Sequence, residues 1–150
     1  MELHVKRFAE LTAAELYAIL RLRVAVFVVE QCCIYQELDD RDQEALHVWL
    51  EDGHGPAAYL RVLPRGVESE HVAIGRVVTR EHRRRLGSRI MREGIRAARE
   101  QMGADSIYVE AQAHARPFYE RQGFRAFGEP FRLDGIPHFT MLLERTGNEL

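Results

Sequence analysis

Hydrophobic residues recur along the chain with two different periods, and these periods divide it into helices and strands. Apolar side chains three and four positions apart predict a first helix over 13–28. Thr12 and Glu15 have the spacing of a capping box, so this helix is expected to begin after Thr12. The segment 31–44 loses the helical period and becomes acidic, which is typical of a loop or a short helical turn.

Runs of alternating or β-branched residues predict strands on both sides of a second amphipathic helix. The expected strands cover 2–8, 45–50, 57–63, 71–79, 106–110, 124–133 and 136–143. The second helix should end before Gly103, and a short third helix should open at Pro117 and end at Gly123. Gly75, inside the fourth strand, marks a bulge or a close approach of the backbone.

The predicted order of elements is β-α-β-β-β-α-β-α-β-β, without a repeat or a linker that would divide the chain. Helices inserted between strands in this way indicate an α/β (α+β) fold with a mixed sheet and helices on both of its faces. A length of 150 residues and 46% hydrophobic residues suit a single domain over 1–150.

Composition limits the kinds of partner that the protein is expected to bind and the cellular compartment in which it is expected to work. A formal net charge of −2 argues against a chain that is basic all over, so affinity for a polyanion would have to be local. The N-terminus does not resemble a signal peptide, and no apolar run approaches a membrane span. The adjacent Cys32 and Cys33 do not form a metal motif and would bridge only with strain, so we expect a cytoplasmic protein with reduced thiols and no bound metal.

The segment 76–91 combines a β-branched run that ends at Thr79, five arginines after it, Gly87 and the start of a helix. Free amides at a helix N-terminus bind anions, and arginine side chains suit phosphate. Three interpretations stay open: a solvated basic loop, a nucleic-acid patch over Arg80–Arg89, or a cradle for a compact phosphorylated ligand. The acidic stretch 30–52 argues against a broad nucleic-acid face.

Several segments resemble the GNAT superfamily of N-acetyltransferases. "HRRRLG" (82–87) is similar to its coenzyme A pyrophosphate loop, with Gly87 in the last signature position and His82 and Arg85 departing from the pattern. "FYERQGF" (118–124) resembles the second signature. "LRLRVAVFVVEQCCIYQELDD", "AQAHARPFYERQGF" and "DGIPHFTM" are similar to the ElaA-like branch, so the resemblance covers nearly the whole chain.

The resemblance implies a GNAT fold in which acetyl-CoA lies in a split between two central parallel strands, 71–79 and 106–110. The end of the first strand would offer its backbone to the pantetheine arm, and the following helix start would hold the pyrophosphate. The cofactor-binding residues expected on this basis are Val77, Val78, Thr79, Arg83, Arg84, Arg85, Gly87 and Ser88.

The implied reaction is direct transfer of an acetyl group from acetyl-CoA to a primary amine. Tyr119, in the second signature, would protonate the leaving thiolate, whereas Phe118 would be the core member of that pair. His114 and Glu110 are candidates for the base. Expected substrate-side residues are Glu30, Gln31, Tyr35, Asp39 and His138.

Other functions remain compatible with these residues. The altered pyrophosphate signature favours, as a second hypothesis, a protein that senses coenzyme A with little turnover. A polyanion-binding module through Arg80–Arg89 is a third. A covalent role for Cys32 or Cys33 lacks an evident base partner, no residue specifies an acyl-homoserine-lactone synthase, and a homodimer is among the arrangements left open.

Overall fold

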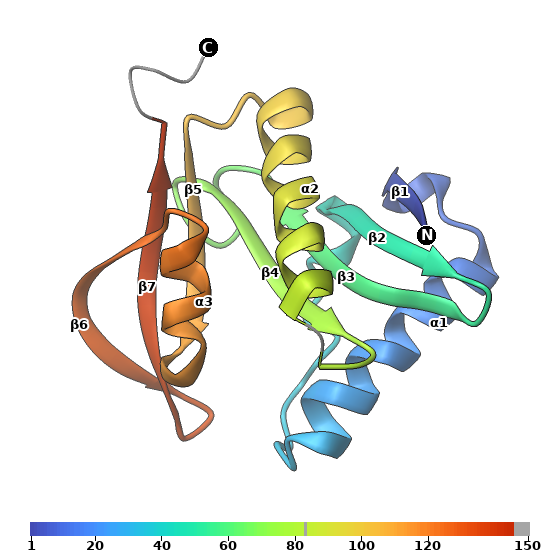
Figure 1. Cartoon of the computed structure of the whole chain (residues 1–150), viewed down its shortest axis with the longest axis horizontal. Coiled ribbons are helices and arrows are strands. Elements are labelled where there is room, and N and C mark those ends of the chain that lie inside the picture. Colours follow the sequence, from blue (N-terminus) through green and yellow to red (C-terminus); the bar gives the residue numbers. More distant parts are fainter. Residues whose placement is uncertain (83, 146–150) are drawn as a thin grey trace.

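The computed structural model describes residues 1–82 and 84–145, with the backbone alone for Arg84. Its elements follow the predicted order (Figure 1), and the third helix begins at Arg116, one residue before Pro117. The strands and helices are β1 (Glu2–Arg7), α1 (Ala13–Val24), β2 (Leu46–Asp52), β3 (Gly55–Leu63), β4 (Val72–Thr79), α2 (Arg84–Met102), β5 (Ser106–Gln112), α3 (Arg116–Arg121), β6 (Arg125–Leu133) and β7 (Ile136–Glu144).

The seven described strands form one mixed sheet in the order β1-β2-β3-β4-β5-β7-β6. Within it β4 and β5 are parallel and the other neighbours are antiparallel. The parallel pair is short: Val72 pairs with Ile107 and Ala73 with Tyr108, and β4 then diverges from β5 (Figure 1). The predicted sheet, splayed between two parallel strands, is confirmed.

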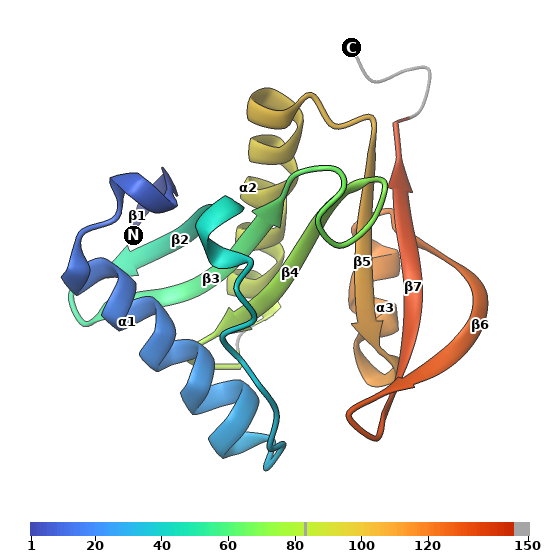
Figure 2. The ribbon, with the colours of Figure 1, turned by 180° about the vertical axis from the view of Figure 1, so that it is seen from behind.

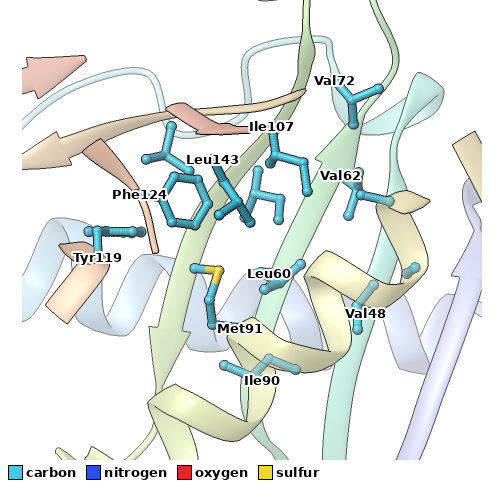
Figure 3. Packing of buried hydrophobic residues seen from close by; sticks show 14 of the residues in the cluster. Val48, Leu60, Val62, Val72, Ile90, Met91, Ile107, Tyr119, Phe124 and Leu143 are labelled. Atoms are coloured by element: carbon cyan, nitrogen blue, oxygen red, sulfur yellow. The ribbon is translucent and has the colours of Figure 1, made fainter. Parts of the chain in front are cut away.

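Helices cover both faces of the sheet (Figures 1 and 2), as predicted. α2 and α3 lie on one face, where Leu60, Met91, Ile107 and Phe124 belong to the largest hydrophobic core (Figure 3). This close packing depends on a glycine of α2, because a Cβ at Gly94 would lie 2.5 Å from the Cδ2 atom of Leu60. α1 lies on the opposite face and buries Ile19 and Leu22 in a second, smaller cluster.

The start of α1 has the predicted capping box. The Thr12 hydroxyl accepts a hydrogen bond from the amide of Glu15 at 3.0 Å, and the Glu15 carboxylate accepts one from the amide of Thr12 at 2.9 Å. The helix continues as a π-helical turn, Ala25–Glu30, two residues beyond the end expected from the sequence. Single π-helical turns often occur beside functional sites because they redirect side chains.

A network of buried ion pairs attaches the segment 31–44 to α1, β3 and β4. Its members are Arg23, Arg61 and Arg76, with Glu37, Asp39 and Asp42. Arg23 and Arg61 are only 0% and 1% exposed. Glu37 accepts hydrogen bonds at 2.8 Å from the Nε atoms of both Arg23 and Arg76. The acidic stretch seen in the sequence is therefore largely a structural feature.

The arginines keep the two aspartates of this network ionised. Burial by itself would raise the pKa of Asp39, but hydrogen bonds and charge from Arg61, and then the charge of Arg76, hold it well below its usual range. Burial likewise opposes ionisation of Asp42, and Arg23 and Arg61 together lower its pKa. For both aspartates, the neighbouring guanidinium groups thus outweigh the effect of burial on the pKa.

We expect Glu37→Gln to lower the free energy of unfolding by about 3 kcal/mol, because it removes the carboxylate that the buried guanidinium of Arg23 shares with the partly buried one of Arg76. Urea denaturation measures this change. Glu70→Gln, on an exposed loop residue, is the control and should alter stability by less than about 0.5 kcal/mol. Equal stability of the two variants would mean that the network does not hold the segment in place.

Candidate active site

A backbone distortion in β4 opens the sheet at the point where β4 leaves β5. Val72 and Ile74 contact the α2 side, Val77 packs on that side as well, and Val78 belongs to the cluster under α1. The alternation therefore breaks between Ile74 and Val77, where Arg76 has a φ of 54°. The sequence placed this irregularity at Gly75, but the residue with the left-handed backbone is Arg76. Its guanidinium is held by Glu37, which compensates for the strained conformation.

A cavity of about 250 Å³ lies in this split between the strands. Four consecutive residues of β4, Ile74 to Val77, form one wall, and Glu110 and Gln112 of β5 form the facing wall. The α1 extension and the following segment contribute Phe27, Gln31, Cys33 and Tyr35, and the remaining lining residues are Glu68, His114, Ala115, Tyr119, Leu133, Asp134, Ile136 and His138. The tertiary structure therefore brings together seven of the predicted site residues: Gln31, Tyr35, Val77, Glu110, His114, Tyr119 and His138.

The cavity joins the two faces of the sheet. Val109 and Ala111 of β5 pack in the same core as Tyr119, on the side of α2 and α3. Tyr108 packs with Ala73 in a separate cluster on the other side, and alternation places Glu110 on that side too. The residues that line the cavity therefore come from both faces of the sheet.

Tyr119 is the buried aromatic residue on the α3 side of the cavity. It is 9% exposed and makes an edge-on contact with Phe124, at 5.8 Å between ring centres. Burial raises the pKa of its phenol to about 12, so the group keeps its proton at neutral pH. Phe118, expected in the core, is instead only half-buried and lies against Gly87 at the start of α2.

Two carboxyl groups meet on the opposite side of the cavity. Glu68, from the loop between β3 and β4, interacts with Glu110 of β5 and with Arg41, whose Nη1 atom lies 3.3 Å from the Glu68 carboxylate. Burial, followed by the charge of Glu110, raises the pKa of Glu68 to about 7. Glu68 was not among the predicted site residues, because nothing in the polar stretch "VESE" (67–70) indicates a carboxylate partner on a distant strand.

Three of the five residues expected on the substrate side line the cavity. Gln31 accepts a hydrogen bond from Gln112 at 3.3 Å across the split, and Tyr35 lies under Arg76 with its hydroxyl bonded to Glu37. His138 is buried, and its Nδ1–H donates to the carbonyl of Ile136 at 2.8 Å.

Two other predicted substrate-side residues do not line the cavity. Asp39 is bound to Arg61 and Arg76 in the ion network. Glu30 pairs with His82 at the outer surface, which connects the α1 extension to the segment before α2.

The arginines of the segment 76–91 differ in their contacts. Arg80 forms an ion pair with Asp52, so it belongs to the β2–β3 turn and not to a helix-start cradle. Arg85 is exposed on the first turn of α2, and the Ser88 hydroxyl accepts a hydrogen bond at 3.3 Å from Gln122, the residue that follows α3.

The other predicted cofactor-binding positions show the following. Val78 is buried under α1, and Thr79 is paired with Ala58 of β3. Arg84 opens α2, whereas Arg83 lies outside the described residues.

The described residues contain no group of three or more His, Cys, Asp or Glu side chains that could hold a metal ion. No described helix is both long and apolar enough to cross a membrane. Cys32 and Cys33 are free thiols, and Cys33 faces the cavity.

Comparison with known proteins places these features in a family. The model of the family described as "Acetyltransferase (GNAT) domain" matches residues 13–145. The protein ElaA of Escherichia coli K12 is 38% identical over 142 residues, which cover 91% of this chain and 92% of ElaA. The crystal structure of Escherichia coli ElaA has a TM-score of 0.88 at 34% identity and covers 96% of this chain and 100% of that chain.

Two further structures define how far the similarity extends. An acyl-CoA N-acyltransferase from Pseudomonas aeruginosa is 39% identical with a TM-score of 0.88, covering 97% of this chain and 100% of its own. FeeM, an N-acyl amino acid synthase from uncultured soil microbes, has a TM-score of 0.77 at 12% identity, covering 96% of this chain and 95% of its own. The latter similarity shows a shared fold alone. The single-domain mixed sheet described above is thus the fold of this group of proteins.

Gly75 lines the cavity next to open space, and a substitution there tests whether packing within the protein requires a glycine. Among the described residues, nothing beyond its chain neighbours would lie within 4 Å of a Cβ placed there. We expect Gly75→Val to raise the free energy of unfolding by about 0.5–1 kcal/mol, since valine favours a strand and restricts the unfolded chain. Urea denaturation measures the change, and a loss of stability would show that packing, and not a ligand, requires the glycine.

Proposed function

The chain belongs to the GNAT family of acetyltransferases, and from this we propose that it transfers an acyl group from an acyl-coenzyme A thioester to a primary amine. Acetyl is the group we expect. One observation carries the proposal: the split between β4 and β5 opens into a cavity that has a protonated phenol on one side and carboxyl groups on the other.

The free edge of β4 supports binding of the thioester arm. Beyond Ala73 the backbone of β4 does not pair with β5, so its amides and carbonyls on that edge are available to the amide groups of the pantetheine arm. Val77 and Ile74 provide apolar walls for the arm. The first turn of α2 lies next along the chain. It carries the exposed Arg85, and its first amides have no partner within the helix, so it suits the pyrophosphate.

The chemistry that fits this cavity is a direct transfer. The nitrogen of the amine attacks the thioester carbonyl, the new C–N bond forms, and the C–S bond breaks. The amine gives up a proton to a base, and the departing sulfur receives one from Tyr119, which then regains its proton from solvent. A phenol with a pKa near 12 remains protonated throughout the working pH range, and it is a donor rather than a base.

The side of the cavity formed by the α1 extension and the β6–β7 hairpin would receive the acceptor. It combines apolar residues such as Phe27 and Ile136 with the carboxyl groups of Glu68 and Glu110. This combination favours a primary amine attached to an apolar group. Amines are cationic before they react, so negative charge on this side would attract them.

Thiol release from acetyl-CoA across a panel of primary amines tests the proposed function. We expect release that depends on the amine, and Tyr119→Phe should lower kcat by about 10²-fold or more while coenzyme A still binds. Tyr17→Phe, on an exposed tyrosine of α1, is the matched control and should leave the rate unchanged. An unaltered rate in Tyr119→Phe would remove the phenol from the mechanism, and tight coenzyme A binding without release would favour a sensor.

Binding of coenzyme A tests the helix-start cradle separately. Arg85→Ala should weaken the affinity about tenfold through loss of one charge-assisted phosphate contact, as measured by calorimetry. Arg125→Ala, on the exposed start of β6, is the control. Undiminished affinity in Arg85→Ala would contradict the cradle, and heparin retention that survives saturating coenzyme A would favour a polyanion site.

A further inference from the structure

The pair formed by Glu68 and Glu110 is unusual because both carboxyl groups face the same cavity. Glu110 comes from β5, just beyond the last residue that pairs with β4, and Glu68 comes from the loop that leads into β4. The Glu68 side chain is 20% exposed. Folding therefore brings two like charges together at the acceptor side of the split, which costs free energy unless a proton or a cation compensates.

Cations nearby compensate for this charge only in part. Arg41, from the segment before β2, lies 3.3 Å from Glu68, and Arg61 of β3 also lowers the pKa of Glu68. Arg61 is already bound to two carboxylates of the ion network. His114 and His138 line the same cavity. The net result is a Glu68 carboxyl whose pKa, at about 7, is close to neutral pH.

We propose that Glu68, oriented by Arg41 and paired with Glu110, is the general base that takes the proton from the acceptor amine. This inference rests on the proposed function and adds to it a residue from the β3–β4 loop. The ionised Glu68 first takes a proton from the alkylammonium group, which frees the lone pair with which the nitrogen attacks the thioester carbonyl. As the C–N bond forms and the C–S bond breaks, the nitrogen loses its second proton to solvent and the departing sulfur receives one from Tyr119. Glu110 is then a positioning residue whose negative charge makes Glu68 a stronger base.

The pH dependence follows from the protonation state that the base requires. Glu68 must be ionised, so kcat/KM for an alkylamine should rise with pH and level off above about pH 7. In Glu68→Gln this rising limb of the pH profile of kcat/KM should disappear, and kcat at pH 7.5 should fall about 10²-fold or more. Glu110→Gln removes a like charge and should move the limb to lower pH. Arg41→Gln removes a cation and should move it to higher pH.

The choice of acceptor separates a base from a residue that only maintains the fold. O-Methylhydroxylamine is uncharged at neutral pH and needs little help to lose its proton. Glu68→Gln should therefore depress its acylation at least tenfold less than that of the alkylamine, whereas a misfolded site would depress both equally. Glu68→Asp should recover part of the alkylamine rate. Glu70→Gln, in the same loop and exposed, is the matched control and should behave as the unaltered protein.

The outcomes distinguish this inference from the proposed function. Amine-dependent thiol release by the unaltered protein, with an unchanged limb in Glu68→Gln, would overturn the role of Glu68 and leave the transferase intact. Loss of the limb in Glu110→Gln, with only a shift in Glu68→Gln, would assign the base to Glu110 and would also overturn it. Absence of thiol release with every amine would overturn the proposed function, and the role of Glu68 with it.

Discussion

The ion pairs of Arg23, Arg61 and Arg76 fix the segment 31–44, and one wall of the cavity depends on that segment. Hydrophobic burial could not hold it, because its large apolar side chains point outward: Ile34 is 96% exposed. Guanidinium groups inside the protein bind its carboxylates instead. Ion pairs of this kind contribute little net free energy but strongly disfavour alternative arrangements, since any misplaced partner leaves a buried charge without compensation. The loop is thus defined by charge and not by apolar packing.

The same network supports the distortion that creates the split. Arg76 has a backbone conformation that is costly for a side chain with a Cβ, and its guanidinium is bound by Glu37 and Asp39. The alternation of β4 changes at Arg76. Before it, Val72 and Ile74 pack in the core under α2; after it, Val77 packs on that side and Val78 on the side of α1. The ion pairs, the strained backbone and the opening of the cavity therefore all meet at Arg76. The result is a cavity whose lining residues come from both faces of the sheet.

The arginine-rich stretch before α2 shows how a uniform composition can hide different roles. Arg80 stabilises the β2–β3 turn through Asp52, His82 contacts Glu30 on the α1 extension, and Arg85 remains on the surface of the first helical turn. The α2 helix itself is positioned by apolar contacts and by Gly87, which lies against Phe118. The helix N-terminus is thus tied to α3, the element that carries Tyr119. A ligand bound at the start of α2 and the phenol beside the split therefore share one rigid support.

The order of the strands and helices, the capping box at Thr12 and the terminal hairpin were determined by the sequence itself, because periodicity and turn residues act over a few positions. Motif resemblance pointed to Tyr119, and the end of a predicted strand made Glu110 a candidate. Both side chains line the cavity. The tertiary structure alone decided that Asp39 is a partner of two arginines, that the distortion falls on Arg76, and that Glu68 faces Glu110. These facts depend on pairs of residues far apart in the chain. The protonation behaviour of a carboxyl group is set by the charges that surround it in space, and a local pattern does not contain them.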